Sequence, residues 1–163
     1  MRNIGQVARR CLAVVVGVGV VAGCVGGCGS SGQGGATVVT LPTGDRFNVV
    51  LPGKWTVDRS NGDGAFLFGG GAGSVFIDET DCESAQACQA KWVKAVGGET
   101  LEETVGGVTY YEHRHYMNGG GDQEHWYVDW NGHVYDVNLS LVGRAAQDPE
   151  PVRSVVRSIE WLE

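Results

Sequence analysis

The sequence predicts an α+β fold in one domain, with an antiparallel sheet of about six to seven strands and two helices. Short segments rich in β-branched and aromatic residues, separated by glycine and proline turns, fill much of residues 38–141. One of these turns is Asn131-Gly132, the strongest short signal for a two-residue hairpin. Residues 84–96 and a segment that begins at Pro149 instead repeat apolar residues with a helical period.

The chain begins with the pattern of an export signal. Three arginines in the first ten residues precede an apolar, uncharged run over residues 12–22, which is too short for a membrane-spanning helix. The run leads into Val21-Ala22-Gly23-Cys24, which resembles the bacterial lipobox. The resemblance implies that residues 1–23 are a lipoprotein signal peptide and that the Cys24 thiol carries diacylglycerol. The protein would then be anchored at the extracytoplasmic side of the cell membrane. The alternative is an ordinary cleaved signal in which Cys24 has no role.

After the signal, residues 24–37 form a linker rich in glycine and serine, a composition typical of a flexible tether. Residues 38–163 have the size of a single domain. The chain has 12 basic and 19 acidic residues, and three of the basic residues lie in the signal, so the rest carries a net charge of −10. A domain with this much negative charge is poorly suited to bind nucleic acid or an anionic bilayer surface. We therefore expect contact with the membrane only through the lipid on Cys24.

The first part of the domain is predicted to form five short strands, at residues 38–41, 47–51, 55–58, 65–68 and 74–78. The Gly69–Gly73 segment, with four glycines, could suggest a phosphate-binding loop. No Gly-Lys-Ser/Thr follows it, so we interpret it as a hairpin loop.

Five cysteines separate by position. Cys11 lies in the signal, Cys24 in the lipobox and Cys28 in the linker, which leaves Cys82 and Cys88 in the domain. Nearby cysteines outside the cytoplasm usually pair, and their six-residue spacing is not that of a zinc knuckle. A Cys82–Cys88 disulfide is therefore expected.

The start of the first helix depends on this disulfide. Thr80-x-x-Glu83 has the form of a capping box. An unbroken helix from there would separate the two cysteines by about 9 Å of rise, whereas a disulfide needs Cα atoms about 4.4–6.8 Å apart. With the disulfide, Ser84 becomes the N-cap of a helix that ends before Gly97-Gly98. The predicted buried stripe of this helix is Ala85, Cys88, Trp92 and Val96.

Three longer strands follow, at residues 108–116, 124–130 and 133–141. A two-residue turn at Asn131-Gly132 pairs Trp130 with His133 and therefore Trp126 with Val137. This register places one set of side chains on the core face: Trp126, Val128, Tyr135, Val137 and Leu139. The opposite face is polar, and it carries His125, Tyr127, Asp129, Asp136, Asn138 and Ser140.

A helix then closes the domain. Asp148 is the predicted N-cap, and Pro149 occupies the first turn, where its missing N–H costs nothing. Its apolar positions repeat as i, i+3, i+4 and i+7, which indicates one buried stripe: Val152, Val155, Val156 and Ile159.

The histidines are the candidate metal ligands. His113 and His115 are two apart on a strand and point to the same side. If Gly119–Gly121 forms a hairpin loop, His115 lies opposite His125, so His113, His115 and His125 would offer ligand types that Zn²⁺ or Cu²⁺ prefers. A register slip of one residue would send them to the other face. The alternative is a solvated polar face that only keeps the sheet soluble.

Catalytic motifs are missing from the sequence. There is no G-x-S-x-G and no H-E-x-x-H, and no catalytic residue or cofactor is expected. The adjacent carboxylates Glu102-Glu103 and Asp78-Glu79 would point apart on a strand and form no acid/base pair. We therefore expect a protein that is not an enzyme, with a hydrolase of unrecognised type as a remaining alternative.

The order of elements is also informative. Phe47-Asn-Val-Val-Leu-Pro-Gly-Lys-Trp55 resembles the start of PsbP-like domains, and the strand 133–141, Asp148-Pro149 and Ser158-Ile-Glu-Trp161 are similar to their C-terminal block. The resemblance covers about residues 38–163. It implies a central antiparallel sheet with helices packed on its faces, an α/β/α sandwich. It also implies an accessory or binding protein at the cell envelope, without a shared catalytic constellation.

The expected function is therefore that of a membrane-anchored, non-enzymatic binding module outside the cytoplasm. Its partner would be an envelope protein or a small ligand. The alternative is a metal-binding lipoprotein that uses His113, His115 and His125.

Overall fold

The structure is a computed structural model, and it describes residues 35–58, 62, 64–117 and 121–163. The predicted signal peptide and the predicted lipidation of Cys24 fall outside these residues. Within the described part of the chain, no helix is long and apolar enough to cross a membrane.

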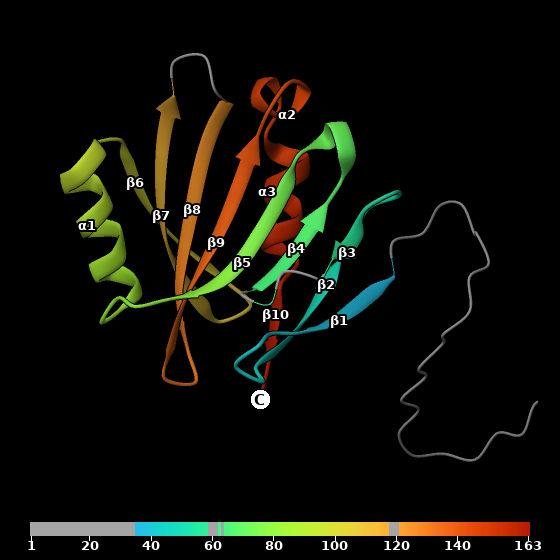
Figure 1. The fold of residues 1–163 in the computed structure, drawn as a ribbon, viewed down its shortest axis with the longest axis horizontal. Helices are drawn as coiled ribbons and strands as arrows, with labels where there is room; N and C mark the ends of the chain where they lie inside the picture. Colours follow the sequence, from blue (N-terminus) through green and yellow to red (C-terminus); the bar gives the residue numbers. More distant parts are fainter. Residues whose placement is uncertain (1–34, 59–61, 63, 118–120) are drawn as a thin grey trace, which may run out of the picture.

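The described residues form two antiparallel sheets (Figure 1). The larger sheet has seven strands in the order β3-β4-β5-β9-β8-β7-β6. Their bounds are Thr56–Asp58 (β3), Gly64–Phe68 (β4), Ser74–Thr80 (β5), Glu99–Val105 (β6), Val108–Met117 (β7), Gly121–Trp130 (β8) and His133–Leu141 (β9). The smaller sheet has the order β1-β2-β10, with bounds Ala36–Thr40, Arg46–Val50 and Glu160–Leu162. The α+β prediction is confirmed, with a second small sheet that was not foreseen.

Helices lie on both sides of the larger sheet (Figure 1). They are α1 (Ala85–Val96), α2 (Arg144–Gln147) and α3 (Glu150–Arg157), and a short 3₁₀ turn, η1, spans Gly70–Ala72 between β4 and β5. The helix α1 contacts β6, β7 and β8 on one face, and α3 contacts β5 and β9 of the same sheet together with β2 of the small sheet. The larger sheet is thus the middle layer.

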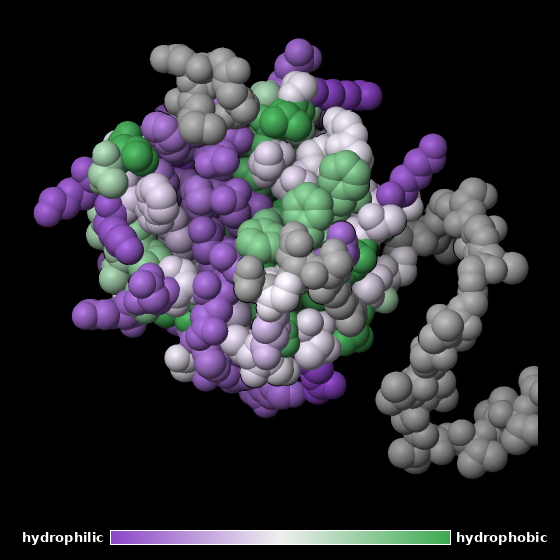
Figure 2. Space-filling model, viewed as in Figure 1, coloured by the Kyte–Doolittle hydropathy of each residue, from purple (hydrophilic) through white to green (hydrophobic). Residues whose placement is uncertain are grey.

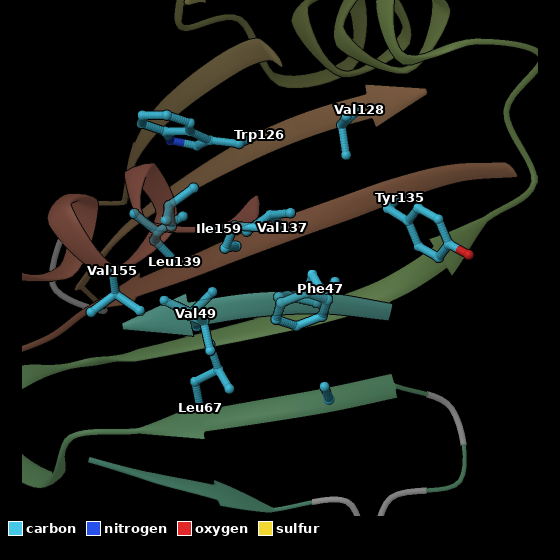
Figure 3. Close-up of a cluster of buried hydrophobic side chains, with 14 of the residues drawn as sticks. Phe47, Val49, Leu67, Trp126, Val128, Tyr135, Val137, Leu139, Val155 and Ile159 are labelled. Atoms are coloured by element: carbon cyan, nitrogen blue, oxygen red, sulfur yellow. The ribbon is translucent and has the colours of Figure 1, made fainter. Parts of the chain in front are cut away.

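The main core lies between the larger sheet, α3 and the small sheet. Figure 3 shows side chains from β2, β4, β8, β9 and α3 gathered in one cluster, among them Phe47, Leu67, Trp126 and Val155. The predicted register of the Asn131-Gly132 hairpin is confirmed, since Trp126 pairs with Val137. We call this side of the larger sheet the core face, and the side that carries Tyr127, His125 and Asp136 the α1 face.

The end of the chain differs from the prediction in two respects. Asp148 is not the cap of the last helix, because it closes the short helix α2, and Pro149 takes the N-cap position of α3. The buried stripe is confirmed for Val152, Val155 and Val156, but Ile159 lies beyond the helix end at Arg157. The chain turns at Ser158 and continues as β10, which pairs Trp161 with Phe47.

The strand β6 was also missed by the sequence interpretation. Three of its seven residues, Glu-Thr-Leu-Glu-Glu-Thr-Val, are glutamates, a residue type that is depleted in strands. It forms because Gly106 and Gly107 both adopt positive φ, as a tight two-residue turn requires, and fold it back onto β7 with Val105 opposite Val108. As an edge strand it leaves most of its side chains in solvent.

Candidate ligand-binding site

A pocket of about 440 Å³ lies on the α1 face. Residues of α1 form one wall, and β7, β8 and β9 supply the other. The lining residues are Trp92, Val96, His113, His115, Gln123, His125, Asp136 and Asn138. All three histidines of the predicted metal site therefore line this pocket.

The helix wall corrects one prediction. Ala85 and Cys88 of the predicted stripe are buried, but Trp92 and Val96 are 40% and 42% exposed. The N-terminal half of α1 is pressed onto the sheet, whereas its C-terminal half overhangs the pocket. The indole of Trp92 stacks over the His125 ring at 5.7 Å between centroids and 14° between planes. These apolar side chains face the pocket instead of a core.

The Cys82–Cys88 disulfide fixes the position of α1. The structure contains this bond, with the two Cα atoms 5.6 Å apart. Ser84 is the N-cap, as predicted, and its hydroxyl accepts a hydrogen bond from the amide of Ala87 at 3.1 Å. Gln89 adds a second attachment, since its side-chain amide donates to the carbonyl oxygens of Leu101 and Glu112. Covalent and polar contacts thus hold the helix at the edge of the sheet.

The sheet wall carries the histidines in a register different from the predicted one. His113, not His115, lies opposite His125, and His115 pairs with Gln123. The shift is two residues, because Gly121 belongs to β8 instead of the loop. A shift of two keeps each side chain on its face, so the three histidines still share one side of the sheet. The fully solvated alternative is wrong for His113 and His125, which are only 1% and 8% exposed.

Two of these rings have defined hydrogen-bond roles. Nδ1 of His125 lies 2.8 Å from Oδ2 of Asp136, and Nε2 of His113 lies 2.7 Å from the carbonyl oxygen of Gly97. A carboxylate and a carbonyl only accept, so each of these nitrogens carries the hydrogen. The second nitrogen of a neutral ring is then an acceptor. For His113 this atom, Nδ1, is buried and has no partner among the described residues.

A buried phenol lies next to the pocket. Tyr127 stacks on His125 at 5.8 Å, and its hydroxyl is buried without a hydrogen-bond partner among the described residues. Burial, together with the charges of Asp136 and Asp78, raises the pKa of Tyr127. The hydroxyl therefore stays protonated.

The predicted metal site is not assembled. His113 stands 6.4 Å from His115 and 6.2 Å from His125 between ring centroids. Within the part of the chain that the structure describes, no three His, Cys, Asp or Glu side chains are placed to hold a metal ion together. One nitrogen of His113 and one of His125 are already engaged with Gly97 and Asp136.

The adjacent carboxylates have structural partners. Glu103 is bound by Arg157 at 2.8 Å, and Glu79 by His133 at 2.7 Å. Glu102 of β6, which lies opposite Tyr111 of β7, is exposed. As expected from the sequence, neither adjacent pair meets as an acid and a base. The sequence did not indicate three of the residues that line the pocket: Trp92, Val96 and Gln123.

Comparison with known proteins shows the fold. No protein family and no curated protein matches the sequence. A crystal structure from Bacteroides thetaiotaomicron superimposes with a TM-score of 0.52 and 11% identity, over 80% of this chain and 49% of that one. The chain thus spans about half the length of that protein. The solution structure of cyanobacterial PsbP (CyanoP) from Synechocystis superimposes with a TM-score of 0.52 and 14% identity, over 85% of this chain and 99% of that one. The chain has a PsbP-like α+β fold.

Proposed function

We propose that the protein is a lipid-anchored binding module on the extracytoplasmic side of the cell membrane, and that it binds a small uncharged molecule in the pocket under α1. The pocket is the observation that carries this proposal. Its volume, about 440 Å³, is in the range of small-molecule sites. It combines an apolar wall, Trp92 and Val96, with a polar wall of imidazole and amide groups. This combination is typical of sites that bind organic ligands in one orientation.

The charges around the pocket favour a ligand without negative charge. None of the lining residues is Lys or Arg, and the chain carries a net charge of −7. An anionic ligand would meet Asp136 and no fixed cation. A neutral molecule can use the side-chain amides of Gln123 and Asn138 as both donors and acceptors.

Binding is better supported than catalysis. The His125–Asp136 pair has the form of a base with its orienting carboxylate. None of the lining residues, however, is a serine, threonine, cysteine or lysine that such a base could activate. We therefore assign the pair to ligand contact and to support of the pocket wall.

Nuclear magnetic resonance of the histidine side chains tests the pocket. The full chain would be purified in detergent and titrated with a library of small uncharged aromatic and hydroxylated fragments. We expect some fragments to shift the imidazole signals of His113, His115 and His125. His133 is a control within the same protein, because it pairs with Glu79 outside the pocket. Trp92→Ala should weaken these shifts, and fragments that move no pocket histidine would contradict the proposal.

The lipid anchor has a separate test. The basic start, the apolar run and the small residues before Cys24 motivate it. In bacteria fed radiolabelled palmitate, the wild-type chain should be labelled and Cys24→Ser should not. A Cys28→Ser variant is the matched control and should keep the label. Equal labelling of wild type and Cys24→Ser would refute the anchor without affecting the pocket.

A further inference from the structure

The pocket continues into an open part of the α1 face. The helix α1 contacts mainly β6, β7 and β8, and on β9 it covers Val134. Farther from the helix, the side chains on this face of β9, β5 and β4, from Asn138 to Phe68, are partly or largely exposed. The strand register arranges them in rows that run across the sheet. One row joins Phe66, Phe76, Asn138, His125 and His113, each opposite the next on the neighbouring strand. A second row joins Phe68, Ser74, Ser140, Gln123 and His115.

Aromatic side chains form the far end of these rows. The ring of Phe66 stacks on Phe68 at 5.8 Å with 19° between planes, and it lies 6.4 Å from Phe76. Phe68 is 47% exposed. Figure 2 shows hydrophobic side chains gathered over β4 and β5, beside a hydrophilic strip over β8 and β9. At the near end, Trp92 and His125 form the second aromatic pair.

Polar groups with free hydrogen-bonding capacity lie between the two aromatic ends. The side chains of Asn138, Gln123 and Ser140 are partly exposed. They form no hydrogen bond with any other residue that the structure describes. Neighbouring strands are about 4.8 Å apart, so about 10 Å separates Phe76 from His125, and the row from Phe66 to His113 extends about 19 Å. An extended ligand can therefore contact both aromatic groups and the polar strip at once.

We propose that this surface binds a neutral oligosaccharide that lies across the strands, from the α1 pocket to the phenylalanines of β4 and β5. The inference rests on the proposed function, because the pocket is one end of the same surface. It adds the class of ligand and the residues that would contact it outside the pocket.

The chemistry of a sugar chain fits each part of the surface. The C–H faces of a pyranose ring pack on flat aromatic rings, which supply large rigid contact areas. Sugar hydroxyls donate and accept, as do the amides of Asn138 and Gln123.

Other ligand classes fit less well. An acyl chain would place hydrocarbon against Asn138, Ser140 and Gln123 and leave these groups without partners. A polyanion would be repelled, because the two rows contain no lysine or arginine and the chain is acidic.

Titration calorimetry of the full chain tests the proposal, in a detergent without a sugar headgroup. The probes are cello-, malto-, manno-, xylo- and chitotetraose, with tetragalacturonate as the anionic comparison. We expect at least one neutral tetraose to bind and tetragalacturonate to bind at least tenfold more weakly. Phe68→Ala and Asn138→Ala should each weaken the neutral ligand at least tenfold. Leu101→Ala removes an apolar side chain that is also exposed, but on the other side of β6, and should change nothing. Unchanged melting temperatures would show that the variants fold.

The other possible outcomes separate the oligosaccharide proposal from the proposed function of the pocket. If no neutral tetraose binds while fragments still shift the pocket histidines, the sugar inference fails and the proposed function stands. If a tetraose binds and depends on Trp92 but not on Phe68 or Asn138, the extended surface is refuted. Equal binding of tetragalacturonate would refute a neutral ligand. If neither fragments nor sugars bind, both proposals fail.

Discussion

The two faces of the seven-stranded sheet are formed by the same strands but are covered to different extents. On the core face, Tyr110, Trp126 and Val137 are covered by α3 and the small sheet and are fully buried. On the α1 face, the buried apolar cluster is small and lies under the helix: Ala85, Cys88, Tyr127 and Val134. The next side chains on the α1 face line a pocket or lie open. The fold therefore obtains its stability from one face and leaves the other free to bind.

Buried charge follows the same division. Two carboxylates on the core face, Glu112 and Glu124, are buried, and each is matched by an arginine. Arg114 binds Glu112 at 2.5 Å, and Arg153 of α3 binds Glu124 through two nitrogens. On the α1 face, Nδ1 of His113 and the Tyr127 hydroxyl are buried without partners among the described residues. The buried carboxylates of the core face are thus paired with arginines, whereas buried polar atoms without a partner among the described residues occur on both faces, since Nε1 of Trp126 and of Trp130 belongs to them too.

The largest expected effect comes from one substitution made on both faces. Trp126→Ala should lower the free energy of unfolding by about 3–5 kcal/mol, because it removes a fully buried ring from the main core. Trp92→Ala removes a half-exposed ring that only stacks on His125, so its cost should be below about 1 kcal/mol. Urea denaturation of both variants measures the difference. Equal losses would show that α1 is as much a part of the core as α3.

The ion pairs of the two faces should differ less. Glu124→Gln removes the charge that Arg153 binds at a buried site, and we expect a loss of about 2–3 kcal/mol. Asp136→Asn makes the matched change on the α1 face, where the His125 pair is more exposed. Its cost should be below about 1 kcal/mol. Thermal unfolding at pH 7 compares them, and a larger loss for Asp136→Asn would reverse the roles assigned to the two faces.

The sequence was sufficient where short-range rules decide the structure. The Asn131-Gly132 turn and the alternation of the two strands that flank it place Trp126 and Val137 in the core. The spacing of Cys82 and Cys88 leads to Ser84 as the helix cap. These features depend on residues close in sequence. The strand β6 escaped prediction because its acidic composition disfavours a strand until β7 is present to pair with it.

The pocket could be foreseen only in part. Strand alternation is enough to place the three histidines on one face. It does so even though the predicted loop, Gly119–Gly121, gives a register that differs by two residues from the observed one. Periodicity alone, however, could not show that Trp92 and Val96 overhang the pocket. An apolar stripe indicates that one side of a helix packs on another element, but it does not show how far along the helix that contact extends. The row from Phe66 to His113 likewise depends on the order β4-β5-β9-β8-β7, which joins segments distant in sequence.

Removing the disulfide should affect the α1 face selectively. Closing so short a loop contributes about 2 kcal/mol in the chain-entropy model, so a Cys82→Ala/Cys88→Ala double variant should lose about that much stability. The bond attaches α1 and does not touch α3. Hydrogen exchange of the variant should therefore accelerate at the amides of α1 more than at those of α3. Equal acceleration in both helices would show that the two faces unfold as one unit.

The smallest effect concerns the pH dependence of the core face. Burial raises the pKa of Glu112 above its usual value, against the lowering effect of Arg114. A carboxyl whose pKa is higher in the folded than in the unfolded protein favours the folded state most when it is protonated, below its unfolded pKa. This contribution is lost as the pH rises through the folded pKa. Relative to Glu112→Gln, which cannot ionise, the wild type should therefore lose stability as the pH rises from about 4 to above the usual carboxyl range, until Glu112 is ionised in the folded protein as well, after which the difference should be constant. Thermal unfolding of both proteins over this range measures it. Other carboxylates titrate in both proteins, and their effects cancel in the comparison. A wild type that gains stability over the variant as the pH rises would mean that Arg114 outweighs burial and that the charge of Glu112 stabilises this face.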